Sequence, residues 1–250
     1  MVGVKLTGTL GRTMAAVPRF RVYVDIGVVV VVLALTNVIA HFTTPWASVA
    51  TVPAAAVGLV LLVRSRGLGW AELGLGREHW RSGLGYAAAA VAAVVTVVAV
   101  GALLPFTRPL FLNNNYATLS GAVIASMIII PLQTVIPEEL AFRGVLHGAL
   151  DRAWGFRGVA AAGSLLFGLW HIATSLGLTS SNVGFTHLFG RGVGGEVAGV
   201  LLAVAATAVA GFVFTWLRRR SGSLLAPIAL HWSLNGIGAL AAALVWQLST

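Results

Sequence analysis

Long, uninterrupted apolar runs are the feature that most constrains how this chain can fold. Hydrophobic residues make up 58% of its 250 residues and charged residues only 9%, whereas a soluble domain carries about 25% charged residues. A helix that crosses a bilayer needs about 20 mostly apolar residues, and several runs reach that length. Because the runs are continuous and do not alternate, they indicate helices and exclude a β-barrel. We therefore predict an all-α, polytopic helical membrane protein.

The runs predict about seven transmembrane helices, or eight if residues 144–153 form a separate half-buried helix. The expected spans are residues 22–40, 46–63, 83–104, 118–139, 159–176, 196–217 and 224–248. In this interpretation the chain turns after Gly144, and residues 177–195 form a polar, glycine-rich loop.

We expect one integral-membrane domain, residues 1–250. It begins with a cytoplasmic tail, 1–21. A group of three N-terminal spans follows, 22–116, and then a core, 117–250, that carries the polar residues considered below.

Arginines are concentrated in the short connections between the spans. The net charge of +9 would suggest nucleic acid as the partner of a soluble protein. In this chain the arginines of the connections instead indicate the topology, because cytoplasmic loops of membrane proteins are enriched in Lys and Arg. We therefore predict no nucleic-acid partner, contact with membrane lipid, and a multi-pass protein of the cell membrane with a cytoplasmic N-terminus. Arg in place of Lys suggests a bacterial source. Cysteine is absent, which excludes thiol nucleophiles and cysteine-ligated metal sites.

Three of the predicted spans carry polar side chains that are costly at membrane depth. Glu138 and Glu139 end one apolar run, and Arg143 follows Glu139 by four residues, so these two can pair on one helix face. Glu138 points about 100° away and is free to act elsewhere. A later span carries His171. The last span carries His231 and Asn235, which are four residues apart and so lie on one helix face.

A free carboxylate, two imidazoles and an amide suit hydrolysis. The carboxylate can take a proton from water and an imidazole can share or return it, while the other imidazole and the amide can donate hydrogen bonds to an oxyanion. Patterns of other proteases, HExxH among them, do not occur. The same residues also fit a proton-coupled membrane transporter or a non-catalytic membrane scaffold. His147, four residues after Arg143, is expected at the cytoplasmic interface.

Three short motifs, in this order, resemble those of the CPBP family of intramembrane proteases, the CAAX-prenyl endopeptidase and bacteriocin-processing group, also called Abi. They are EExxxR at Glu138–Arg143, FxxxH at Phe167–His171 and HxxxN at His231–Asn235. The resemblance covers residues 130–236, and the first three spans are similar only in being hydrophobic. It implies an intramembrane endopeptidase that cleaves peptide or membrane-protein substrates near the cytosolic membrane face, in a polar cavity open to the cytoplasmic side.

The resemblance also implies a role for each matching residue. Glu138 and His171 would activate water, His231 and Asn235 would form the oxyanion hole, and Glu139 with Arg143 would support the site. Family members are often labelled metalloproteases, although the resemblance implies a mechanism without a ligated metal. The alternative is a zinc (Zn2+) site in which Glu138, His171 and His231 hold the ion with a water. Members that process prenylated proteins have eight spans, where this chain is expected to have seven.

Overall fold

The computed structural model describes residues 19–44 and 46–249, and within them it is all-α. Six helices in these described residues are long and apolar enough to cross a membrane, which confirms the predicted helical, multi-pass membrane protein. They are α1 (Arg19–Phe42), α2 (Ala47–Ser65), α3 (Trp80–Leu103, preceded by the short turn η1, Arg77–His79), the run Leu119–Trp170, α10 (Val193–Ser221) and the run Leu225–Gln247. Most of the predicted cytoplasmic tail, 1–21, lies outside the described residues.

The run Leu119–Trp170 carries two of the three motifs. It is built from α4 (Leu119–Ile124), η4 (Ala125–Val135), α5 (Ile136–Glu139), η5 (Leu140–Leu146), α6 (His147–Gly158), η6 (Val159–Gly163) and α7 (Ser164–Trp170). Three of these stretches, η4, η5 and η6, are π-helical. Such wide turns are rare and gather at functional sites, and here two of them flank the Glu138–Glu139 pair.

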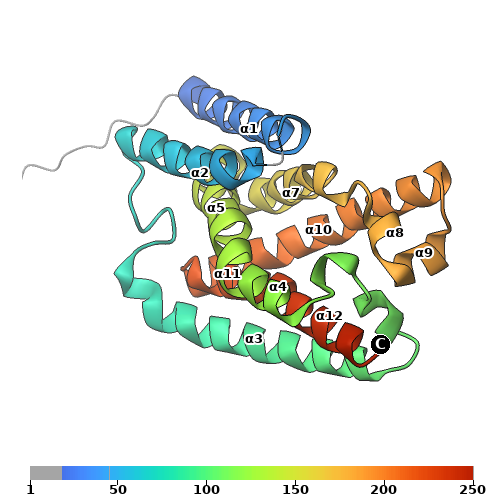
Figure 1. Ribbon diagram of the computed structural model, residues 1–250. Helices are drawn as coiled ribbons and strands as arrows, with labels where there is room; N and C mark the ends of the chain where they lie inside the picture. The colour runs from blue at the N-terminus through green and yellow to red at the C-terminus, as the bar shows by residue number, and fades with distance from the viewer. Residues whose placement is uncertain (1–18, 45, 250) are drawn as a thin grey trace, which may run out of the picture.

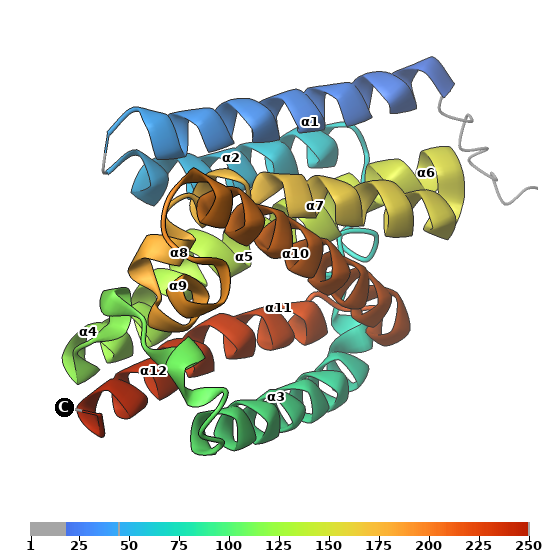
Figure 2. The same cartoon turned by 90° about the vertical axis from the view of Figure 1, so that its right-hand side faces the viewer.

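The chain reverses direction at Gly155. This residue has φ 62° and ψ −168°, a conformation that is essentially restricted to glycine. Residues 119–154 form one leg before the reversal, and residues 156–170 return beside the end of that leg (Figure 2). The predicted turn after Gly144 is therefore wrong, because the helix continues through Gly144 to the end of the first leg.

The difference between seven predicted spans and six long helices arises at this reversal. The predicted spans 118–139 and 159–176 are the two legs of one helical run. Helix α7 ends at Trp170, so His171 lies just beyond the end of the returning leg and not inside a span that continues to residue 176.

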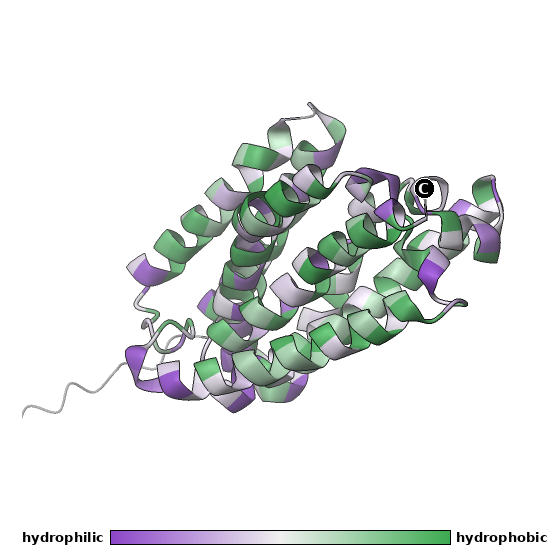
Figure 3. Ribbon diagram, turned by 60° about the horizontal axis from the view of Figure 1, so that its bottom comes forward, coloured by the Kyte–Doolittle hydropathy of each residue, from purple (hydrophilic) through white to green (hydrophobic). Residues whose placement is uncertain are grey.

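The last long run is built from α11 (Leu225–Trp232), the π-helical η8 (Ser233–Ile237) and α12 (Gly238–Gln247). In the bundle, α1 and α2 lie on one side and α3 on the opposite side, with α5, α10 and α11 between them (Figure 1). The helices are mostly hydrophobic along their lengths, and hydrophilic residues gather towards the ends of the bundle (Figure 3).

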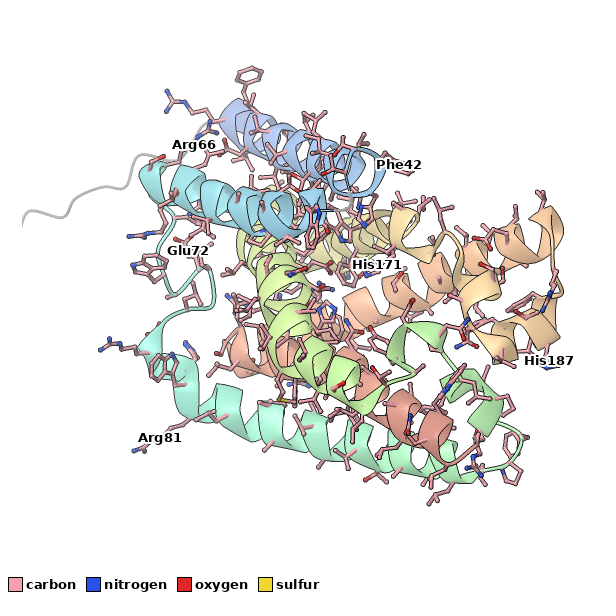
Figure 4. The ribbon with its side chains drawn as sticks, viewed as in Figure 1. Phe42, Arg66, Glu72, Arg81, His171 and His187 are labelled. Atoms are coloured by element: carbon pink, nitrogen blue, oxygen red, sulfur yellow. The ribbon has the colours of Figure 1, made fainter. Side chains whose placement is uncertain are left out.

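The two ends of the bundle differ in composition. The arginine end consists of residues 64–81, 151–158 and 218–224, and the labelled Arg66, Glu72 and Arg81 lie there (Figure 4). The loop end consists of residues 104–118 and 174–192, with His187 labelled in the same view. His171 lies between these ends (Figure 4).

The predicted loop 177–195 is partly helical, which corrects the prediction. It contains α8 (Leu178–Ser181) and α9 (Val183–Phe189). Asn182 caps α9, because its Oδ1 accepts a hydrogen bond from Phe185 N at 3.1 Å. Its Nδ2 donates to Leu110 O at 2.8 Å, and Val183 N donates to the backbone carbonyl of Leu112 at 3.1 Å. These bonds fasten the two segments of the loop end to each other.

We predict that Gly155→Ala lowers the free energy of unfolding by about 1–3 kcal/mol, the usual cost of holding a residue with a side chain in such a conformation. The control is Gly85→Ala. Gly85 lies in α3, and an added Cβ there meets no atom within 4 Å, so we expect it to be neutral or slightly stabilising. Thermal unfolding in detergent compares the variants, and equal losses in both would contradict a special role for Gly155.

Candidate active site

Glu139 and Arg143 form an ion pair in the interior of the bundle. Arg143 Nη1 donates to Glu139 Oε1 at 3.0 Å, and their side chains are 2% and 0% exposed. Arg143 Nη2 also donates to Gly211 O of α10 at 3.4 Å. The guanidinium lies over the rings of Phe167, 3.9 Å from the centroid, and Phe214, 4.7 Å from the centroid. The pairing predicted from the four-residue spacing is thus confirmed.

Glu138 points away from this pair, as its position on the helix predicts. Trp170 Nε1 donates to Glu138 Oε1 at 3.0 Å. The second oxygen, Oε2, is buried and has no hydrogen-bond partner. It lies 4.0 Å from His171 Nε2 and 4.0 Å from His231 Nε2. One carboxylate oxygen is therefore fixed, and the other faces both imidazoles.

Hydrogen bonds to the Nδ1 atoms orient both imidazole rings. His171 Nδ1 lies 2.8 Å from the backbone oxygen of Phe167. Since a carbonyl oxygen can only accept, this Nδ1 carries a proton. His231 Nδ1 lies 2.8 Å from Glu139 Oε1, and the ionised carboxylate is again only an acceptor. In a neutral ring each Nε2 then presents its lone pair toward Glu138 Oε2.

Asn235 follows His231 on the last helical run, within the π-helical turn η8. Its side chain is exposed and lines the same cavity as Glu138, His171 and His231. The neighbouring Trp232 docks this run against η4, because its Nε1 donates to the backbone oxygen of Ser126 at 2.9 Å. The structure thus brings together all four predicted site residues, from α5, the end of α7, α11 and η8.

The shared cavity has a volume of about 620 Å³. It extends from the site toward the loop end, where Leu110, Tyr116, Thr174 and Leu178 line it. Burial raises the pKa of Tyr116 above its usual value of 10.0, so its hydroxyl stays protonated and can donate a hydrogen bond. Among the lining residues, the carboxylate of Glu138 is the single acidic group, and no Arg or Lys is present.

Comparison with known families supports the same core. Residues 119–237 match the family model of the Rce1-like type II CAAX prenyl endopeptidases. This part of the chain is similar to an Rce1-like domain. The match includes all three motifs, and members of this family are typically peptidases. No curated protein and no solved structure matches the chain significantly.

The zinc alternative can be tested against the positions of the donors in this part of the chain. Two ligands on a tetrahedral zinc ion lie about 3.4 Å apart, given bonds of about 2.0–2.1 Å. The distances from Glu138 Oε2 to His171 Nε2 and His231 Nε2 are 4.0 Å. In the part of the chain that the structure describes, no three His, Asp or Glu side chains form a group able to hold a metal. These residues as placed do not fit the zinc alternative, and a mechanism without a ligated metal stays a prediction.

Sequence reasoning missed Trp170 as a functional residue. Its indole N–H fixes Glu138 Oε1, and its backbone oxygen accepts from Asn37 Nδ2 of α1 at 2.9 Å. The sequence holds only a weak indication of this role. Trp170 directly precedes His171, and a buried Trp N–H usually finds a hydrogen-bond acceptor nearby. His147 was placed at the interface, but it is only partly exposed and its Nδ1 is buried without a hydrogen-bond partner.

We predict that Glu139→Gln lowers the free energy of unfolding by about 3–5 kcal/mol, because it leaves Arg143 as an uncompensated buried charge. The matched control is Glu138→Gln. Its amide oxygen can still accept from Trp170, so we expect a change below about 1 kcal/mol. Chemical unfolding in detergent measures both. Equal stability of the two variants would contradict the division of the glutamates into a supporting and an available group.

Proposed function

We propose that the protein is an intramembrane endopeptidase that hydrolyses peptide bonds with a water molecule activated by Glu138 and His171. One observation carries the proposal: the unpartnered Glu138 Oε2 lies 4.0 Å from the Nε2 atoms of His171 and His231 and faces a cavity of about 620 Å³. The family match favours a peptidase over the transporter and scaffold alternatives.

In the first step, water binds between Glu138 Oε2 and His171 Nε2. Glu138 accepts a proton as the water oxygen attacks the carbonyl carbon of the scissile bond. Trp170 holds the other oxygen of Glu138 at 3.0 Å, so the carboxylate does not need to turn during the attack. The product of this step is a tetrahedral intermediate with a negative oxygen.

His231 and Asn235 stabilise that negative oxygen. The amide of Asn235 donates one hydrogen bond, and removal of one such donor typically lowers kcat by about 10²–10³. His231 donates from Nε2 when this atom is protonated, while its Nδ1 stays bonded to Glu139 at 2.8 Å. The Glu139 carboxylate then balances the charge of the ring.

In the second step, the carbon–nitrogen bond breaks. The proton taken up by Glu138 passes to the leaving amine, directly or through His171, and the carboxylate is regenerated. The reaction consumes one water and yields a carboxylate and an amine. Arg143 touches none of the reacting atoms. It keeps Glu139, and through Glu139 the ring of His231, in position.

We predict that Glu138→Gln lowers the rate of peptide cleavage by at least about 10³, because the amide cannot accept the proton of water. The assay uses purified protein in proteoliposomes, a mixture of synthetic hydrophobic peptides, and mass spectrometry of the products. Glu78→Gln serves as the control, since Glu78 lies on the exposed turn η1 (Arg77–His79). Unchanged cleavage by a folded Glu138→Gln protein would refute the proposed function.

Removal of metal ions tests the mechanism separately. We expect the wild-type protein to retain its cleavage rate within about twofold after dialysis against a zinc chelator, because the proposed steps use only protein groups. The control is a known zinc peptidase treated in parallel. Loss of cleavage that added zinc restores would instead assign Glu138, His171 and His231 as ligands.

A further inference from the structure

Three arginines line a pocket at the arginine end, apart from the candidate active site. Arg21 lies near the start of α1, Arg66 directly follows α2, and Arg152 lies in α6. The pocket has a volume of about 660 Å³, and the labelled Arg66 lies beside the start of α1 (Figure 4). Since these residues are far apart in the sequence, the fold brings three guanidinium groups to one place.

The positive charge of this pocket exceeds the negative charge of its own side chains. Among the described residues that line it, Asp25 is the single acidic one, and it pairs with Arg66. Arg152 Nη2 donates to Glu72 Oε1 at 2.5 Å. Arg21 has no ion-pair partner among the residues that the structure describes. Each guanidinium carries five N–H donors, so even the two paired arginines keep donors for a further anion.

The surroundings of the pocket favour an anion that is attached to hydrocarbon chains. The pocket lies at the start of the apolar span Phe20–Phe42, and its lining includes Phe20 and Val24, which are 77% and 40% exposed. Close to these residues, Tyr23 of α1 and Trp154 of α6 form a ring pair with centroids 6.1 Å apart, and both side chains are half exposed. Exposed Tyr and Trp are enriched where a membrane span meets the lipid headgroups. A basic pocket next to an exposed apolar surface at this depth fits a phospholipid.

We propose that this pocket binds the phosphate group of an anionic membrane phospholipid, and that the acyl chains of the lipid lie along Phe20 and Val24. Arginine suits this ligand because its planar guanidinium can bond two phosphate oxygens at once. One bound phosphate would join α1, the end of α2 and α6. The lipid site is separate from the proposed catalysis, because none of its lining residues lines the cavity at Glu138.

Native mass spectrometry tests the proposal by counting the lipids that stay bound to the full-length protein. The protein is incubated in neutral detergent with phosphatidylglycerol or with phosphatidylcholine of identical acyl chains. Arg21→Gln removes the guanidinium that has no ion-pair partner, so it breaks no salt bridge of the described chain. The matched control is Arg81→Gln, which removes the same charge from an exposed arginine at the arginine end, outside the pocket (Figure 4).

We expect the wild-type protein and the control to retain phosphatidylglycerol at least about fivefold more than phosphatidylcholine, because only phosphatidylglycerol carries a net negative charge. Arg21→Gln should reduce this preference by at least about threefold, since one basic residue near a membrane surface contributes roughly that much to the attraction of an anionic lipid. Equal preference in Arg21→Gln and Arg81→Gln, or no preference in the wild-type protein, would overturn the proposal. Arg152→Gln replaces Arg21→Gln if the latter does not fold.

Inorganic phosphate distinguishes a lipid site from a site for a soluble anion. We expect a large excess of inorganic phosphate to leave the bound phosphatidylglycerol in place, because the acyl chains add apolar contacts that the free ion lacks. Complete displacement would assign the pocket to a soluble phosphate and overturn the lipid assignment.

Thermal unfolding gives a second readout of the same site. A ligand that binds only the folded state raises the midpoint temperature of unfolding. Phosphatidylglycerol should therefore raise this midpoint in the wild-type protein by about 2–4 °C more than phosphatidylcholine does. The difference should be absent in Arg21→Gln and present in Arg81→Gln. Equal shifts by both lipids in the wild-type protein would contradict the proposal.

Discussion

The buried ion pair between Glu139 and Arg143 is the interaction on which the site depends. Removing two charges from water costs several kcal/mol for each ion, and further hydrogen bonds to the pair offset part of that cost. Here those bonds lead to other helices: Arg143 reaches Gly211 O of α10 and the ring of Phe167 on α7, and Glu139 reaches His231 of α11. One ion pair thereby holds together the helices that carry all three motifs.

The pair also explains why two glutamates stand side by side. Neighbouring residues on a helix point about 100° apart, so Glu139 can face the interior while Glu138 faces the cavity. Two unpaired carboxylates this close would repel, and one would take up a proton. Because Arg143 compensates the charge of Glu139 at 3.0 Å, Glu138 does not face a second uncompensated carboxylate. The Glu139–Arg143 pair thus affects the electrostatic environment of Glu138, the proposed base, as well as holding the helices around it together.

The sequence was sufficient to predict the elements that depend on local spacing. The four-residue separation of Glu139 and Arg143, and the apolar runs, follow from helix geometry. The reversal at Gly155 does not follow from local spacing, because the sequence does not show whether a glycine adopts a negative φ or a positive one such as the 62° of Gly155. The chain has 30 glycines, so the one at the reversal cannot be singled out from the sequence. The bond from Trp170 to Glu138 joins residues 32 positions apart, so only the tertiary fold reveals it.

The reversal determines the direction from which His171 approaches the cavity that Glu138 also lines. The first leg carries Glu138 from the loop end toward the arginine end, and Gly155 turns the second leg back, so α7 delivers His171 toward the loop end again. Had the chain turned after Gly144, a second leg of the same length would have ended elsewhere along the bundle, since a helix advances 1.5 Å per residue. The stretch that continues past Gly144 also contributes buried side chains, such as Leu146 at the end of η5 and Leu150 in α6. The same segment that brings His171 to 4.0 Å from Glu138 therefore also contributes side chains to the buried core.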